Sequence, residues 1–307
     1  MLVIGNELGA LDSLNLITQK KNSRFFFNNL IPMNGFPIRQ INSNHIDGIF
    51  FGSSNGTLGL LNKSLKKIIK NKNVGDNDLT AFHIFKNGNI IAFYTNYIRL
   101  WKKYKNLYFF SRKKFVCNKT FKYVFVSKSE NFFLSTSFFE NQIYLWSISG
   151  NRIILGGRNE LKELIVSMKG MRDDIFTIGT HTGSIYIYSI KGELIRSIKK
   201  NSQKINPGKP ELQKSVAWLD KNTLISGKSS GKIEIFDLRS SKSISYLVGH
   251  CSEVSNLDTS GDKPGSLPFL LASSDVSGQL KLWDIRNKKE IFFQKRFISK
   301  ITSISFF

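Results

Sequence analysis

A short phrase of six or seven residues recurs along this chain, and the repetition restricts the chain to a repeat architecture. Each copy starts with glycine or another turn-forming residue, continues with alternating apolar positions, and ends with leucine or an aromatic residue followed by a polar residue. The period-two alternation predicts that every copy is a β-strand opened by a tight turn. The copies start at Gly9, Gly56, Asn96, Asn141, Gly183, Gly231 and Gly278, and the copy at Gly9 is the weakest.

A short apolar run precedes every copy, and the two together predict a hairpin in each unit. Ile49–Phe51, for example, lies before the copy at Gly56, with Gly52–Asn55 as the turn. A third alternating strand is expected upstream of the hairpin and a fourth strand downstream of it. Third strands are expected at Phe121–Val126, Leu161–Val166, Ser215–Leu219 and Ile301–Phe306, and fourth strands at Leu107–Phe110, Leu194–Ile198 and Ile244–Val248.

Units of 40–48 residues with four antiparallel strands predict the blades of a β-propeller. The chain ends complement each other, because Ile301–Phe306 is an inner strand without neighbours and Leu2–Ile4 is a middle strand without an inner one. Pairing these strands removes exposed sheet edges. We therefore predict an all-β fold, a single seven-bladed β-propeller over residues 1–307 with four-stranded antiparallel blades and no appended domain. N- and C-terminal strands, from about residues 300–307 and 1–30, together close the last blade.

The phrases resemble the WD40-repeat family, above all Ile233–Arg239 and Leu280–Arg286, and Gly249–His250 resembles that family's Gly-His dipeptide. The resemblance covers essentially the whole chain; it is strong in the last two repeats and faint in the first. It implies a rigid propeller that presents loops to several partners.

The resemblance also implies hydrogen bonds between Trp, Ser, His and Asp side chains within a blade. Only the last full repeat offers Trp283, Ser273 and His250, and Ser277 occupies the place where the turn aspartate is expected. We therefore expect most blades to be held by packing alone. The residues expected to serve as structural repeat positions are Trp101, Trp146, Tyr188, Phe236, Asp237, His250, Trp283 and Asp284.

The sequence contains no His-Glu-x-x-His and no paired-cysteine motif. Ser226–Ser229 looks like the end of a phosphate-binding loop, but Asn222 stands where that loop needs glycine. We expect no enzyme, no catalytic residue, no metal, no cofactor and no small-molecule substrate. Two cysteines, Cys117 and Cys251, and the lack of an apolar run long enough for a membrane helix predict an intracellular, reducing location and no membrane contact.

Basic residues are numerous and unevenly placed: Lys and Arg total 45 against 22 Asp and Glu, and residues 79–129 contain no acidic residue. We expect Lys102–Lys105 to enter an outermost strand, and Arg112–Lys119 and Lys199–Lys209 to lie in loops between blades. Such residues predict a basic surface that attracts RNA or an acidic partner. The alternative is that A/T-rich codons account for lysines that are simply solvated. The candidate surface comprises Lys102, Lys103, Lys105, Arg112, Lys113, Lys114, Lys119, Lys199, Lys200, Lys204 and Lys209.

These features predict a non-catalytic scaffold for protein interactions. The excess of basic over acidic residues favours a subunit of a nuclear or nucleolar ribonucleoprotein assembly, in ribosome biogenesis or pre-mRNA processing. Its partners would be other proteins of a multi-subunit complex, with RNA as a further candidate through contacts to phosphates. The alternative is an adaptor that recognises peptide motifs or acidic proteins in cell-cycle, ubiquitin-ligase or signalling complexes. Fold alone does not choose between them.

Overall fold

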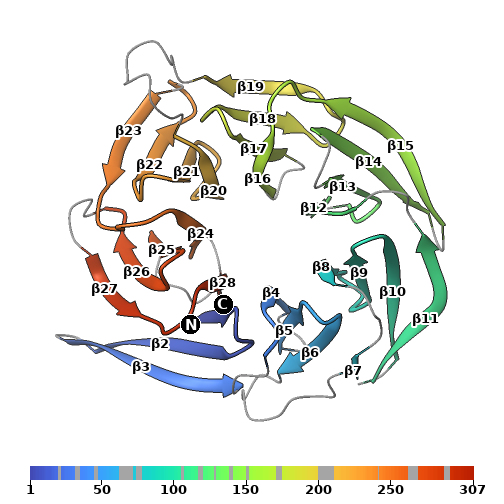
Figure 1. Cartoon of the computed structure of the whole chain (residues 1–307), viewed down its shortest axis with the longest axis horizontal. Coiled ribbons are helices and arrows are strands. Elements are labelled where there is room, and N and C mark those ends of the chain that lie inside the picture. Colours follow the sequence, from blue (N-terminus) through green and yellow to red (C-terminus); the bar gives the residue numbers. More distant parts are fainter. Residues whose placement is uncertain are drawn as a thin grey trace.

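Seven four-stranded antiparallel sheets stand in a ring (Figure 1), which confirms the predicted seven-bladed, all-β propeller. This computed structural model describes residues 1–19, 22–31, 35–44, 48–61, 72–73, 78–104, 107–116, 120–127, 129–137, 141–149, 152–170, 175–199, 211–240, 242–261, 269–286 and 291–307. Within those ranges there is no helix long and apolar enough to cross a membrane.

Blades I to III each use consecutive strands, with the innermost strand first. Blade I contains β4 (Ile38–Asn44), β5 (Gly48–Ser53), β6 (Thr57–Leu61) and β7 (Lys72–Asn73). Blade II contains β8 (Leu79–Ile84), β9 (Ile90–Tyr94), β10 (Tyr97–Tyr104) and β11 (Leu107–Val116). Blade III contains β12 (Tyr123–Val126), β13 (Phe132–Thr136), β14 (Gln142–Ser149) and β15 (Arg152–Glu160).

Blades IV to VI continue the same order, and the closing blade combines both ends of the chain. Blade IV contains β16 (Ile165–Gly170), β17 (Ile175–Thr180), β18 (Ile185–Ser189) and β19 (Leu194–Ile198). Blade V contains β20 (Gln213–Trp218), β21 (Thr223–Lys228), β22 (Ile233–Asp237) and β23 (Lys242–Leu247). Blade VI contains β24 (Val254–Thr259), β25 (Leu270–Asp275), β26 (Gln279–Asp284) and β27 (Ile291–Arg296). The closing blade contains β28 (Ile301–Phe306), β1 (Leu2–Asn6), β2 (Leu11–Gln19) and β3 (Asn22–Ile31).

One inner strand lies later in the sequence than predicted. The expected strand Leu161–Val166 starts instead at Ile165 and continues to Gly170. Leu161 belongs to the preceding connection, where it is buried and its N–H donates to the carbonyl of Asn141 at 2.8 Å. The apolar character of Leu161 therefore reflects burial in a connection rather than strand alternation.

The closure of the ring is an antiparallel pair between the two ends of the sequence. In β1 and β28, Leu2 lies opposite Phe306 and Ile4 lies opposite Ile304. The Met1 ammonium also donates to the carbonyl of Phe307 at 3.1 Å. The predicted pairing of Ile301–Phe306 with Leu2–Ile4 is confirmed.

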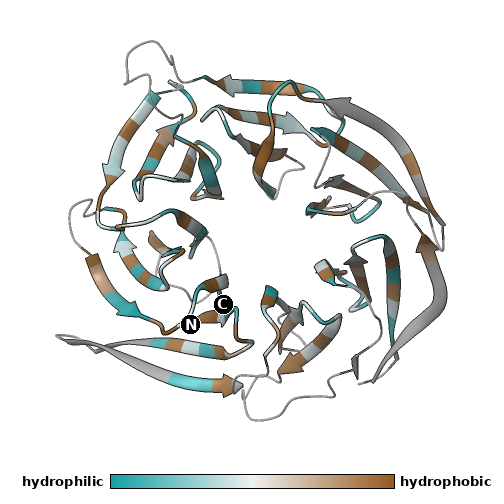
Figure 2. Cartoon of the chain, in the orientation of Figure 1, coloured by the Kyte–Doolittle hydropathy of each residue, from teal (hydrophilic) through white to brown (hydrophobic). Residues whose placement is uncertain are grey.

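Apolar side chains fill the spaces between neighbouring blades. Ile233 and Ile235 of blade V, for example, share one cluster with Val254 and Trp283 of blade VI. Figure 2 shows hydrophobic and hydrophilic positions alternating along many of the strands. Successive side chains of a strand point to opposite faces of its sheet. Each blade therefore presents side chains to both of its neighbours in the ring.

Polar side chains of the innermost strands bind the backbone of the next innermost strand. Each bond joins two blades that are adjacent in the ring, so the set runs from blade III through the closing blade to blade II. The bonds are Lys122 Nζ to Ile165 O at 3.0 Å, Ser167 Oγ to Gln213 O at 3.0 Å, Ser215 Oγ to Val254 O at 2.8 Å, Asn256 Nδ2 to Ile301 O at 2.9 Å, Thr302 Oγ1 to Ile38 O at 2.5 Å, and Phe82 N to Gln40 Oε1 at 2.8 Å.

Strand direction places two kinds of link on one side of the ring, which we call the connection face. Because the strands of a blade alternate in direction, the turn from second to third strand lies on the same side as the connection from the fourth strand to the next blade. The turns Glu7–Ala10 and Val276–Gly278 and the connections after β3, β11, β15, β23 and β27 lie on this face. The chain ends Met1 and Phe307 lie on the other side.

We predict that Ile301→Ala destabilises the whole propeller, because Ile301 is fully buried in the innermost strand that closes the ring. Loss of a buried isoleucine side chain costs about 2–5 kcal/mol of unfolding free energy. Denaturant unfolding followed by circular dichroism measures this change. Ser305→Ala, a change at a half-buried position of the same strand, should cost less than about 1 kcal/mol. Equal unfolding free energies for the two variants would argue against the importance of the closure.

Candidate interaction surface

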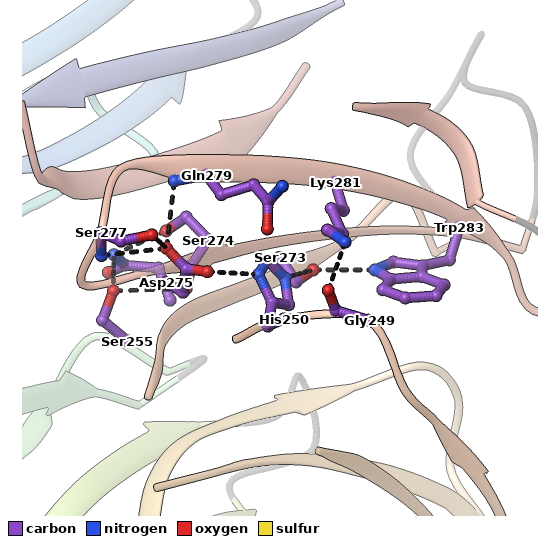
Figure 3. A network of polar contacts seen from close by, with 11 residues as sticks. Gly249, His250, Ser255, Ser273, Ser274, Asp275, Ser277, Gln279, Lys281 and Trp283 are labelled. Atoms are coloured by element: carbon purple, nitrogen blue, oxygen red, sulfur yellow. Dashed lines mark hydrogen bonds and ion pairs between the residues drawn. The ribbon is translucent and has the colours of Figure 1, made fainter. Parts of the chain in front are cut away.

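A chain of buried hydrogen bonds joins a connection to a turn in blade VI (Figure 3). The Trp283 indole donates to Ser273 Oγ at 2.8 Å, and this hydroxyl lies 2.7 Å from His250 Nε2. His250 Nδ1 lies 2.9 Å from Asp275 Oδ2. Asp275 Oδ1 then accepts from both the backbone and hydroxyl of Ser277, at 3.0 and 2.7 Å. The network thereby ties the connection that carries His250 to the turn that follows Asp275.

The donor order assigns a neutral imidazole to His250. The carboxylate of Asp275 accepts only, so Nδ1 of His250 carries the proton and Nε2 accepts from the Ser273 hydroxyl. Burial lowers the pKa of His250, and this effect outweighs the opposing effect of the bond to Asp275. Burial opposes ionisation of Asp275, but its bonds to Ser277, the Gln279 N–H and His250 leave the pKa below its usual value.

The prediction that Ser277 replaces the turn aspartate was wrong. Asp275 ends strand β25 and caps the turn by accepting from the N–H groups of Ser277 and Gln279, each at 3.0 Å. Ser277 is a donor to this carboxylate rather than its substitute. The signal was present in the sequence, since Asp275 directly precedes the turn that Gly278 completes with a positive φ of 84°.

Blade IV makes the same connection-to-turn link with different chemistry. Glu163, in the connection before β16, accepts from Thr180 Oγ1 at 2.5 Å and from the Tyr186 hydroxyl at 2.9 Å. It also accepts from Thr182 and, at 3.4 Å, from Ser184. Burial opposes ionisation of Glu163, but these hydroxyl donors prevail and lower its pKa.

Blade V uses a buried ion pair at this place. Lys228 ends β21, as Asp275 ends β25, and its ammonium lies 2.5 Å from the carboxylate of Glu234. A second carboxylate, that of Glu211 in the preceding connection, lies 4.0 Å away. The side chain of Lys228 is only 1% exposed, so its charge depends on these partners. The expectation that most blades are held by packing alone is therefore wrong for blades IV and V.

Backbone bonds hold the connections against the turns in most of the ring. In six blades, the residue at the start of the turn donates its N–H to a carbonyl of the connection. The six bonds are Glu7 to Lys300, Ser54 to Pro37, Thr95 to Asp78, His181 to Leu164, Ser229 to Leu212 and Val276 to Glu253, at 2.8–3.1 Å. The described ends of these six connections, directly before the innermost strands, are thus attached to the turns.

Large apolar side chains are exposed on the connection face. They lie in or directly beside five of the connections between blades, whose described parts otherwise carry mostly polar residues. These residues are Phe36, Val116, Leu164, Val248 and Ile298, and Leu8 adds a sixth from a turn. Exposed apolar residues that gather on one face of a protein mark interaction sites. Periodicity does not reveal them, because they lie in loops.

The predicted basic residues do not form one group in the structure. Lys102 and Lys103 lie near the end of β10, the third strand of blade II, and not in its outermost strand as predicted. Lys102 is exposed and Lys103 is half-buried, and both lie toward the side opposite the connection face. Lys199 is exposed on the connection face, two blades further along.

The predicted loop at Arg112–Lys119 is also partly wrong. Arg112, Lys113 and Lys114 lie within strand β11, because its pairing with β10 continues through Lys114 opposite Arg99 to the end of the strand. The register of β10 against β11 shifts between Arg99 and Trp101, and the pairing continues beyond this shift. The hairpin is therefore longer than the repeated phrase suggested. The other candidates, Lys105, Lys119, Lys200, Lys204 and Lys209, lie outside the described residues.

The aromatic repeat positions lie in the spaces between blades. Trp101, Trp146, Phe236 and Trp283 are buried, whereas Tyr188 is half-buried. Trp146 repeats the indole bond of blade VI, since it donates to Ser135 Oγ at 2.8 Å.

The two aspartates that follow the phrase bind their own neighbouring arginines. Asp237 accepts from Arg239 at 3.1 and 2.9 Å, and Asp284 accepts from Arg286 at 3.0 and 2.6 Å. Within the described ranges, no group of three His, Cys, Asp or Glu side chains is placed to hold a metal.

The chain is distantly similar to a known protein. No protein-family model matches the chain. Meiotic fizzy-related protein 1 of Schizosaccharomyces pombe is 27% identical to it over 159 residues. The matched segment covers 49% of this chain and 33% of that relative, so the chain spans about a third of the length of the relative.

We predict that acidification destabilises the protein through His250. Its pKa is lower in the folded state than the unfolded value of about 6.5, so the folded state binds fewer protons. The stability that depends on neutral His250 is present above about pH 6.5 and is lost as the pH falls below it. His250→Asn should flatten this dependence and should also cost about 1–3 kcal/mol, because Ser273 and Asp275 lose a partner.

Denaturant unfolding between pH 5 and pH 8 measures the pH dependence. Burial lowers the pKa of His83 to about 4, so His83→Asn serves as the comparison and should leave the His250 contribution in place. An unchanged slope in His250→Asn would contradict the assignment of a neutral His250.

We predict that Glu234→Ala destabilises the protein by about 3–5 kcal/mol, because it leaves the buried ammonium of Lys228 without its nearest carboxylate. Adding Lys228→Met removes the charge and should recover most of the loss. Unfolding free energies of the single and double variants give this comparison. Equal losses in both would mean that packing, and not charge, determines the effect.

Proposed function

Because the chain is a WD40-repeat β-propeller, a scaffold for protein interactions, we propose that it is a non-catalytic adaptor that binds segments of partner proteins on its connection face. The proposal is supported by one observation above all: exposed apolar side chains at five of the blade-to-blade connections. Fold alone would not choose this function, whereas a surface of this kind favours protein partners.

The attachment of the loops supports the same proposal. Backbone bonds fix the connections to the turns in six blades, and side-chain networks add to them in blades IV, V and VI. A surface whose loops are already ordered loses little conformational entropy when it binds. The connection face is therefore suited to recognition of short, extended segments.

The similarity to a fizzy-related protein favours an adaptor in cell division. The name of that relative places it in meiosis, and the similar segment is 159 residues long. The partner class proposed here is thus peptide motifs in cell-cycle proteins.

A second candidate is a scaffold of a nuclear or nucleolar ribonucleoprotein assembly. It is favoured by the stretch 79–129, which lacks acidic residues, and by the exposed Lys102 within it. In this case the basic residues would contact RNA phosphates. Both candidates imply a location with access to the nucleus.

We predict that replacing Val116, Leu164 and Val248 with serine reduces the recovery of partner proteins by the tagged full-length chain. These side chains are exposed on the connection face and contribute little to the core, so the folded state should be retained. Quantitative mass spectrometry of affinity-purified material, with and without ribonuclease, provides the measurement.

The matched control replaces Leu194, Ile244 and Tyr246 with serine, since these apolar side chains are exposed on the outermost strands. It should retain the partners. Partners that are still recovered with the connection-face variant, but are lost after ribonuclease treatment, would favour the ribonucleoprotein candidate. Loss of the same partners in both variants would contradict a role specific to the connection face.

A further inference from the structure

Three segments that each carry an exposed apolar side chain lie next to one another at the closing blade. Leu8 lies in the turn between β1 and β2, Phe36 in the connection before β4, and Ile298 in the connection before β28. Their exposed fractions are 37%, 47% and 95%. We call these three residues the closing-blade patch; no other blade brings together so many exposed apolar residues on the described part of the connection face.

Hydrogen bonds hold the three segments of the patch together. The Gly35 N–H donates to the Leu8 carbonyl at 2.9 Å, which places Phe36 beside the turn. The Glu7 N–H donates to the Lys300 carbonyl at 3.0 Å, and the Glu7 carboxylate accepts from the Lys300 N–H at 3.0 Å. The connection that carries Ile298 is therefore fixed to the same turn.

The turn itself is ordered by Asn6. Its side-chain oxygen accepts from the N–H groups of Leu8 and Ala10, at 3.1 and 2.8 Å. Asn6 therefore caps this turn as Asp275 caps the turn of blade VI. The apolar side chains stand on ordered backbone, so binding to them requires little reorganisation.

Charges beside the patch are mainly basic. Arg296 and Lys295 are exposed two and three residues before Ile298, and Lys300 follows two residues after it. The acidic group of Glu7 is engaged by the backbone of Lys300, and Asp78 pairs with Arg39 at 3.5 Å. An incoming segment thus meets apolar side chains beside a positive rim.

We infer that the closing-blade patch binds a protein segment whose apolar side chains are flanked by acidic residues. The inference rests on the proposed adaptor function and deepens it by naming the site and the chemistry of the segment. Apolar contact with the patch supplies affinity, and acidic flanks match the rim of Lys295, Arg296 and Lys300. A second copy of the chain is a poorer occupant, because two such rims would repel each other.

The test is binding of a fluorescein-labelled peptide in which leucine and phenylalanine alternate with serine between ends of aspartate and glutamate. Fluorescence polarisation with the full-length protein measures its affinity, and methyl NMR of Leu8 and Ile298 locates it. Ile298→Asp should weaken binding by about tenfold or more. Raising the salt concentration should weaken binding further, because the flanks act through charge.

Ile244→Asp is the matched control, because Ile244 is an exposed apolar residue on the outermost strand of blade V and outside the proposed binding residues. It should leave the affinity unchanged. A peptide with lysine flanks should bind at least about tenfold more weakly. Equal affinity for the two peptides, or an unchanged affinity in Ile298→Asp, would overturn the inference.

Two further outcomes would also overturn the inference. Sedimentation that shows self-association lost in Ile298→Asp would assign the patch to a second copy, and displacement of the peptide by a single-stranded RNA would assign it to nucleic acid. The variants of Val116, Leu164 and Val248 separate this inference from the proposed function. If those variants lose partner proteins while the peptide fails to bind, only the assignment of the patch is wrong.

Discussion

The pairing of β28 with β1 is the contact on which the rest of the structure depends. It joins residues about 300 positions apart and turns a row of sheets into a ring, in which every blade has two neighbours. Without this contact, the innermost strand of the closing blade would be missing and two blade faces would be open to water. Among the polar bonds between innermost strands, the bond from Thr302 to the Ile38 carbonyl joins the C-terminal and N-terminal segments and so depends on closure.

The repeated phrase was sufficient to predict the blades because strand alternation and turn residues are local properties. The phrase and its spacing identified most of the innermost strands, most of the hairpins and the pairing of the chain ends. It misplaced the strand at Ile165, where a buried connection has the same apolar character as a strand. It also ended β11 too early, because the length of a hairpin depends on its partner strand.

The candidate site was harder to predict because its residues become neighbours only in the folded ring. Asp275 precedes its turn in a recognisable place, but Glu163 and the pair of Lys228 with Glu234 follow no shared pattern. Blades IV, V and VI each use a different set of donors and acceptors at this place. The exposed residues Leu8, Phe36 and Ile298 are likewise far apart in sequence, and closure brings the segment that carries Ile298 to the other two.

The origin of the closing blade from both ends has a consequence for biosynthesis. Leu2–Asn6 is synthesised long before its inner neighbour, which is complete only after Phe306 has been added. At synthesis rates of roughly 5–20 residues per second, that strand waits about 15–60 s with one edge free. Free edges pair readily with other chains, so the nascent protein needs protection until the ribosome has passed Phe306.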